Sequence, residues 1–310
     1  MSNPRPTDMA ASVRQKLLNL AKKIGDDFNL VLTRYGNERL LYRLSRSPDG
    51  QQFVLKGATL FLLWSAEVYR PTKDIDLLGQ GDNSPDALAA AFRRIVAVEV
   101  EDDGLIFDAK AIKAAPIGIE AEYRGVRVTI PAKLGAARLR LQVDVGFGDA
   151  VTPPPKVATL PTLLSQPAPK LKAYSMDTVV AEKFHAMVDL GLTNSRMKDF
   201  FDIWVLATTF EFEGSCLHQA IKATFTRRQT AVPQEVPLAL TDQFAKDSSK
   251  QRQWKAFIGN TAPKHRDMTL DDVVQAVRAF VMPVVRSIKE AKGFSLVWRS
   301  KGTWKAASPG

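Results

Sequence analysis

The chain has 310 residues, of which 45% are hydrophobic and 25% are charged, close to the averages for soluble globular proteins. A single cysteine, Cys216, excludes an intramolecular disulfide framework, and three histidines without metal-ligand spacing argue against a histidine-based metal site. No segment is apolar enough for a membrane helix and the N-terminus lacks a secretory signal, so we expect a cytoplasmic protein with no membrane partner. The net charge of +10 favours an anionic partner, of which nucleic acid is the commonest.

The first half of the chain mixes two hydrophobic periods. A period near 3.6 predicts helices over residues 10–24, 26–44, 58–66 and 85–98. Alternation of apolar and polar residues, or a short apolar run, predicts strands over residues 53–56, 73–78, 138–147 and, as several short pieces with turn glycines at Gly118 and Gly125, 105–130.

The second half is predicted to be helical. The stretch from Val151 to Pro169 holds six prolines, cannot form a regular helix and is the candidate domain boundary. Beyond it, helices are predicted over residues 176–190, 196–210, 217–226 and 270–287, whereas residues 227–265 show no clear pattern. We therefore expect an α+β (mixed α/β) protein, with a small mixed sheet in residues 1–165 and a helical domain in residues 166–310.

Three aspartates carry the chemistry of the predicted sheet. Asp74 and Asp76 are two residues apart on one strand and so project from the same face. Asp144 lies on the polar face of another strand. Taken alone, an Asp-x-Asp pair is most often a solvent-facing strand edge. Together, three strand carboxylates could hold two Mg²⁺ ions for attack at a nucleotide phosphate.

A glycine turn precedes the carboxylate pair. Lys56, Gly57 and Ala58 lie where a predicted strand passes into a predicted helix. A glycine at such a junction lets backbone N–H groups approach a phosphate, although it commonly does no more than form the turn. The short helix after it would bring Asp74 back beside Gly57, so that a phosphate cradle and a metal site would adjoin.

These motifs resemble a known family. The runs Leu55–Trp64 and Arg70–Leu78, with the later runs Met176–Phe184 and Arg196–Ile203, are similar in sequence and in order to the AbiEii-type nucleotidyltransferase toxins. That family belongs to the DNA polymerase β-like nucleotidyltransferase superfamily and acts in abortive-infection toxin–antitoxin pairs. The resemblance implies a polymerase β-like core at the N-terminus and a C-terminal domain that contributes to the nucleotide cleft.

The resemblance also implies roles for single residues. Asp74 and Asp76 match the metal-binding pair, and Asp144 matches the third carboxylate more loosely. Gly57 matches the first glycine of the family turn, whereas Ala58 stands where Gly or Ser is common and offers no hydroxyl. The remaining matches are Lys183, expected at the nucleotide phosphates, and the Lys-Asp-x-x-Asp element formed by Lys198, Asp199 and Asp202.

From the residues alone, the helical motifs allow simpler interpretations. Lys183 borders an apolar stripe, so it could lie beside the core or reach into a cleft. Lys198 and Asp202 have the i,i+4 spacing of an ordinary surface ion pair. His185 and Cys216 are expected to be structural, and Asp177 could simply complement the helix dipole.

The predicted function is transfer of a nucleoside monophosphate from an NTP substrate, with two Mg²⁺ ions, to an acceptor. The basic charge favours RNA as that acceptor, and the resemblance implies tRNA, growth arrest and a cognate antitoxin. The basic residues near the C-terminus, Lys301 among them, support an anionic partner. Alternatives are a protein or small-molecule acceptor, and a non-catalytic nucleotide- or RNA-binding regulator, for which Ala58 is the only indication.

Overall fold

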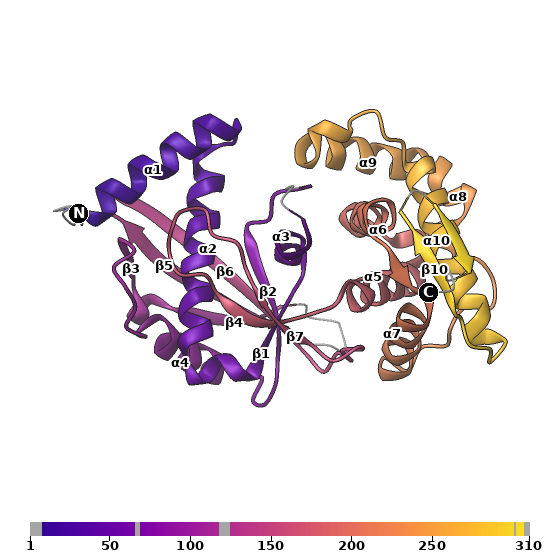
Figure 1. Cartoon of the computed structure of the whole chain (residues 1–310), viewed down its shortest axis with the longest axis horizontal. Helices are drawn as coiled ribbons and strands as arrows, with labels where there is room; N and C mark the ends of the chain where they lie inside the picture. The colour runs from indigo at the N-terminus through magenta and orange to yellow at the C-terminus, as the bar shows by residue number, and fades with distance from the viewer. Residues whose placement is uncertain (1–7, 66–68, 118–124, 301, 307–310) are drawn as a thin grey trace. The chain divides into compact units, whose positions relative to one another are not determined.

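A computed structural model describes residues 8–65, 69–117, 125–300 and 302–306 (Figure 1). Two compact units make up the chain: unit 1 comprises Met1–Gly148 and Lys156–Ala173, and unit 2 comprises Asp149–Pro155 and Tyr174–Gly310. The division expected between residues 165 and 166 falls within the segment 156–173 of unit 1. Ala66, Gly118 and Lys301, which entered the predictions above, lie outside the described residues.

Local sequence signals set the helix ends of unit 1. The side chain of Asp8 accepts a hydrogen bond from the N–H of Ala11 at the start of the first helix, which ends at Gly25 in the left-handed conformation. Ser84 caps a later helix whose first residue is Pro85. The α-helices of this unit are α1 (Met9–Ile24), α2 (Phe28–Arg46), α3 (Phe61–Trp64) and α4 (Pro85–Val96).

An eight-stranded mixed sheet forms the centre of unit 1. Its strands lie in the order β3-β5-β6-β2-β1-β8-β7, with β4 also paired to β5. The central pair β2 and β6 is parallel, whereas β1 is antiparallel to β2. The strands are β1 (Phe53–Lys56), β2 (Asp74–Gly79), β3 (Leu105–Phe107), β4 (Lys113–Ile117), β5 (Gly125–Leu134), β6 (Ala137–Phe147), β7 (Lys156–Thr159) and β8 (Lys170–Ala173).

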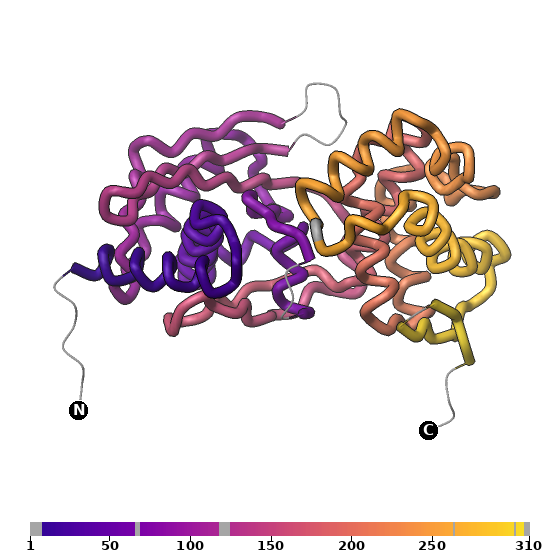
Figure 2. Tube along the Cα trace, turned by 90° about the horizontal axis from the view of Figure 1, so that it is seen from above, coloured from indigo at the N-terminus to yellow at the C-terminus, as the bar shows by residue number. Residues whose placement is uncertain are grey.

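The long helices cover one face of this sheet. Gly36 of α2 lies against β6, because a Cβ atom there would stand 2.9 Å from side-chain methyls of Leu139 and Leu141. Phe92 of α4 contacts Phe53, which shares this face. In Figure 2, α1 and α2, drawn in indigo, lie to one side of the magenta strands. The opposite face of β4, β5 and β6, called the open face below, carries their polar residues.

Unit 2 is built mainly from helices. They are α5 (Met176–Leu190), α6 (Met197–Thr209), α7 (Gly214–Arg227), α8 (Asp242–Lys246), α9 (Ser248–Thr261) and α10 (Leu270–Lys289). A capping box joins Thr269 and Asp272 at the start of α10. A three-stranded sheet, formed by β9 (Phe212–Glu213), β10 (Leu296–Arg299) and β11 (Thr303–Ala306), was not predicted.

The expected mixed α/β class is confirmed, with two corrections. The eight-stranded sheet is larger than the small sheet expected. The helix predicted from residue 58 is a 3-10 turn over Ala58–Leu60 followed by the single turn of α3. Among the described residues, no helix has the length and apolar character needed to cross a membrane.

Candidate active site

A charged row crosses four strands of unit 1. Arg127 of β5 pairs with Asp144 of β6, Asp144 with Asp76 of β2, and Asp76 with Lys56 of β1. Residues paired in register project from the same face of a sheet, so these four side chains share the open face. The charged row (Arg127, Asp144, Asp76 and Lys56) therefore places two carboxylates between two cations.

Asp74 lies one step along the same face. It is opposite Gln142 of β6, whose Nε2 donates a 2.6 Å hydrogen bond to Oδ1 of Asp74. Ile75, between the two aspartates, is fully buried on the helix-covered face. The backbone thus brings Asp74, Asp76 and Asp144 onto one face of two adjacent strands, as the alternation in sequence predicted.

The glycine turn contacts the carboxylate pair directly. Gly57 has a φ of +74°, a conformation that favours glycine. A Cβ atom at this position would overlap Oδ2 of Asp76. The absence of a side chain at Gly57 therefore lets the Asp76 carboxylate lie against the backbone of the turn. Ala58, the next residue, is buried at the start of the 3-10 turn.

Arg127 is a functional candidate that the sequence reasoning missed. Its Nε and Nη2 donate to the two carboxylate oxygens of Asp144, each at 2.8 Å. This hydrogen bonding raises the pKa of Arg127 above its usual range against the opposing effect of desolvation, and the charges of Asp144, Asp74 and Asp76 add to it. The only signal in the sequence was its place on the polar face of an alternating strand.

The donor set of the three aspartates fits a hard divalent cation such as Mg²⁺, because carboxylate oxygens on one face are the ligands it prefers. The side chains are nevertheless engaged with protein partners. Asp144 accepts from Arg127 and Asp74 accepts from Gln142. Within the part of the chain that the structure describes, no three acidic, His or Cys side chains converge as a metal-binding group.

Unit 2 contains a second charged cluster. Nζ of Lys183 on α5 lies 2.6 Å from Oδ1 of Asp199 and 2.9 Å from Oδ2 of Asp202, both on α6. The side chains are 14%, 6% and 1% exposed, so this is a buried ion triad. The surface pairing of Lys198 with Asp202 was wrong: Asp202 is buried and pairs with Lys183, whereas Lys198 is exposed.

The other residues singled out from the sequence, His185, Cys216 and Asp177, lie in unit 2 among residues of its helices and loops. His185 is buried; its Nε2 lies 2.9 Å from Oγ1 of Thr230 and its Nδ1 3.2 Å from Nη1 of Arg228. Burial, with the charge of Arg228 second, lowers the His185 pKa. Cys216 is half-buried on α7. Burial raises the pKa of Asp177, in the first turn of α5, to about 6.

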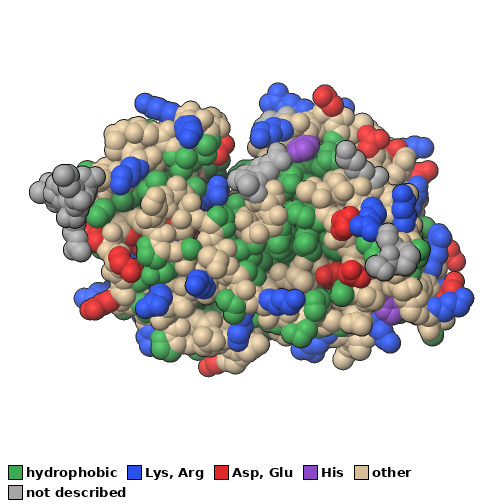
Figure 3. Space-filling model, in the orientation of Figure 1, with side chains coloured by type: hydrophobic (Ala, Val, Ile, Leu, Met, Phe, Trp, Pro, Cys, Tyr) green, Lys and Arg blue, Asp and Glu red, His purple; other side chains and the backbone are tan. Residues whose placement is uncertain are grey.

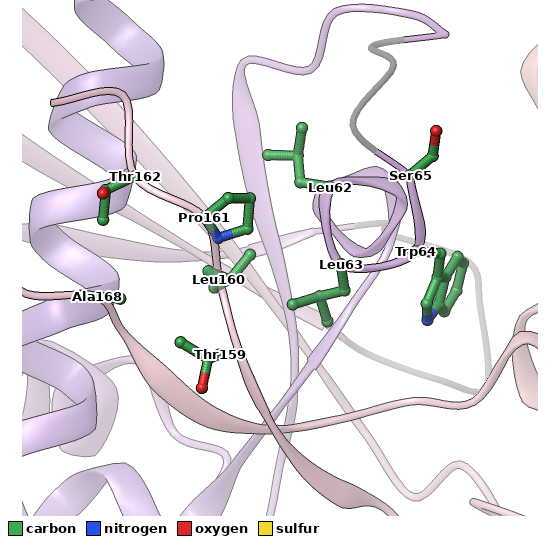
Figure 4. A pocket seen from close by; sticks show the side chains of 9 residues that line it. All are labelled: Leu62, Leu63, Trp64, Ser65, Thr159, Leu160, Pro161, Thr162 and Ala168. Atoms are coloured by element: carbon green, nitrogen blue, oxygen red, sulfur yellow. The ribbon is translucent and has the colours of Figure 1, made fainter.

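A pocket of about 480 Å³ lies within unit 1. Figure 4 shows α3, with Leu62, Leu63 and Trp64, on one side and the segment around Pro161 on the other. Its lining is mainly apolar, and it includes none of the aspartates or lysines predicted to act on a nucleotide.

Unit 1 has the features of a nucleotidyltransferase core. Its mixed sheet carries an Asp-x-Asp pair, a third carboxylate on the adjacent strand and a glycine turn against the pair. Comparison with protein families agrees. Residues 39–279 match the family model described as "Nucleotidyl transferase AbiEii toxin, Type IV TA system". The chain belongs to this family.

Solved structures and curated sequences add little to this assignment. A candidate nucleotidyltransferase from Helicobacter pylori superimposes with a TM-score of 0.45 at 14% identity, over 93% of this chain and 100% of that one. JHP933 from Helicobacter pylori gives a TM-score of 0.44 at 15% identity, over 92% and 95%. No curated protein sequence matches the chain.

Proposed function

We propose that this protein transfers a nucleoside monophosphate from an NTP to RNA, with pyrophosphate as the second product. The observation that carries the proposal is the placement of Asp76 against Gly57 and beside Asp144. The contact between Gly57 and Asp76 places a turn that could bind phosphates next to a carboxylate that could bind a cation. Membership of a nucleotidyltransferase toxin family supports the same chemistry.

Asp74 and Asp76 would hold Mg²⁺, and Asp144 would join them when it leaves Arg127. Bound there, Mg²⁺ would neutralise charge on the phosphates and lower the pKa of an attacking hydroxyl. The chain itself supplies the remaining parts. The turn at Lys56, Gly57 and Ala58 would bind phosphate oxygens through backbone N–H groups and the Lys56 ammonium.

Lys183 in unit 2 is proposed to bind the triphosphate. Its two carboxylate partners hold the ammonium in a fixed position, which spares the cost of ordering a long side chain during the reaction. Asp199 and Asp202 would then act as positioning residues for Lys183. Lys198 is exposed and could contact the nucleotide directly.

RNA is proposed as the acceptor because the chain carries a net charge of +10. The family description names a toxin of a type IV toxin–antitoxin system. We therefore propose that the acceptor is tRNA, that its modification arrests growth, and that a cognate antitoxin is the protein partner. A cytoplasmic location stays a prediction.

Incubation of the purified protein with each labelled NTP, MgCl₂ and total RNA tests the proposal. The expected result is label in an RNase-sensitive product with the wild-type protein and none with Asp76→Asn. Label in an RNase-resistant product would move the acceptor to a protein or a small molecule. No transfer with any NTP, or equal transfer by Asp76→Asn, would overturn the proposal.

A further inference from the structure

The open face of unit 1 carries a basic strip that leads to the charged row. Its members are exposed cations on three neighbouring strands: Lys113 of β4, Lys133 of β5, and Arg138 and Arg140 of β6. Lys133 is directly opposite Arg138, and Lys113 is opposite Thr129, which pairs in turn with Gln142. Each of the four therefore projects from the same face as Asp144.

The strip follows the direction of one strand. Arg138, Arg140, Gln142 and Asp144 alternate with the buried residues Leu139, Leu141 and Val143. Neighbours on one face are two residues apart, about 7 Å along the strand, so Arg138 and Asp144 are about 20 Å apart. Arg138 and Arg140 thus lie along the same face of β6 as Asp144, one of the carboxylates proposed to act on a nucleotide.

Within the described part of the chain, these cations stand apart from the carboxylates. Among residues 8–65, 69–117, 125–300 and 302–306, no carboxylate forms an ion pair with Lys113, Lys133, Arg138 or Arg140. Arg127, where the strip meets the charged row, pairs with Asp144 instead. By contrast, on the face of unit 1 shown in Figure 3 the Lys and Arg side chains are scattered singly.

We propose that the basic strip (Lys113, Lys133, Arg138 and Arg140) binds the phosphate backbone of the RNA acceptor and guides the reacting nucleotide to the charged row. This inference rests on the proposed function for its ligand. Regular spacing of cations along an open sheet suits a repeating polyanion, and repeated contacts with phosphates bind without regard to sequence. A membrane surface fits less well, because Ile106, beside Lys133, is the one large apolar side chain that is mostly exposed in the described residues of β3, β4, β5 and β6.

Binding of labelled poly(U) RNA, measured in EDTA and without nucleotide over a range of salt, tests the strip separately from catalysis. Arg138→Gln/Arg140→Gln removes two of its cations. Lys22→Gln/Lys23→Gln removes two exposed cations from the end of α1 and changes the net charge equally. Loss of two phosphate contacts should lower the slope of log K against log salt by about 1.4 and weaken binding about tenfold at physiological salt. The control should bind as the wild type does.

Each other outcome is decisive. The strip would be overturned as an RNA site if the strip variant bound poly(U) as the wild type does, or if both variants bound it equally weakly. Binding of the wild type to phosphatidylserine vesicles but not to poly(U) would also overturn it. None of these results depends on nucleotidyl transfer. Strip-dependent RNA binding without transfer of label would instead support the strip and contradict the proposed function.

Discussion

Both carboxylate oxygens of Asp144 accept hydrogen bonds from the guanidinium of Arg127, at 2.8 Å each. Asp144 is also opposite Asp76 in the charged row, so two negative charges are neighbours there. The positive charge of Arg127 compensates one of them. A cation bound by the aspartates would compete with Arg127 for Asp144. Arg127 is thus expected to be most important for stability when no divalent cation is bound.

Replacement of Arg127 by Gln should therefore destabilise the protein in EDTA more than in MgCl₂. We expect the free energy of unfolding to fall by about 1 kcal/mol in EDTA, because Arg127 is partly exposed and such pairs contribute modestly. MgCl₂ should restore most of this loss. Denaturant unfolding measures both values, and Arg127→Lys should lie between the wild type and Arg127→Gln. An equal gain from MgCl₂ in the wild type and in Arg127→Gln would contradict the competition.

A side chain at position 57 should displace the Asp76 carboxylate. Gly57→Ala is expected to reduce nucleotidyl transfer about 100-fold, since a small misplacement of a reacting group has effects of that order. Gly81→Ala is a matched control: Gly81 also has a positive φ, and nothing lies within 4 Å of its would-be Cβ. Both substitutions place an alanine at a positive φ, but only Gly57→Ala brings a side chain against Asp76 and should lose activity. Equal losses would show that strain alone, rather than contact with Asp76, is responsible.

The buried triad of unit 2 predicts a large stability effect. Lys183→Met leaves Asp199 and Asp202 buried without their shared cation and should lower the free energy of unfolding by about 3 kcal/mol. Lys183→Met/Asp202→Asn should recover part of this loss, because one of the buried charges is removed. Lys198→Met, at an exposed position on α6, should change stability by less than about 0.5 kcal/mol. An unrecovered loss in the double variant would argue against charge burial as the cause.

Asp177 gives a pH-dependent prediction. Burial raises its pKa to about 6 in the folded protein, with hydrogen bonds to its own backbone N–H and to Ser175 acting in the opposite direction and Glu213 adding a little. A carboxyl whose folded pKa is raised favours the folded state at low pH and loses that contribution as pH rises through about 6. Asp177→Asn should therefore match the wild type near pH 4 and be more stable near pH 7, by at most about 3 kcal/mol. Denaturant titrations from pH 4 to pH 7 measure the free energy of unfolding of both proteins. A difference between Asp177→Asn and the wild type that shrank with rising pH would contradict the prediction.

Sequence patterns predicted the parts of the site that depend on local periodicity. Alternation along residues 138–147 placed Asp144 on the polar face, and the same rule placed Asp74 and Asp76 together. Which strands are neighbours depends on contacts distant in sequence. The pairing of Arg127 with Asp144 and of Lys56 with Asp76 was therefore not predictable from periodicity.

Tertiary packing and short strand length explain the remaining differences. The i,i+4 spacing of Lys198 and Asp202 suggested a surface pair, but tertiary packing buries Asp202 against Lys183 of another helix. The strands β10 and β11 escaped prediction because they are four residues each and lie in a basic, polar region. Proline-rich residues 151–169 suggested only a boundary, yet they include β7, which pairs with β8 in the main sheet.

Asp76 is the residue on which the proposed nucleotidyl transfer most depends. The most direct measurement is transfer of label from each NTP to total RNA by the wild type and by Asp76→Asn, with matched folding shown by thermal melting. We expect RNase-sensitive, Mg²⁺-dependent label with the wild type and a loss of at least about 100-fold in a folded Asp76→Asn protein. Undiminished transfer by the folded variant would contradict that expectation.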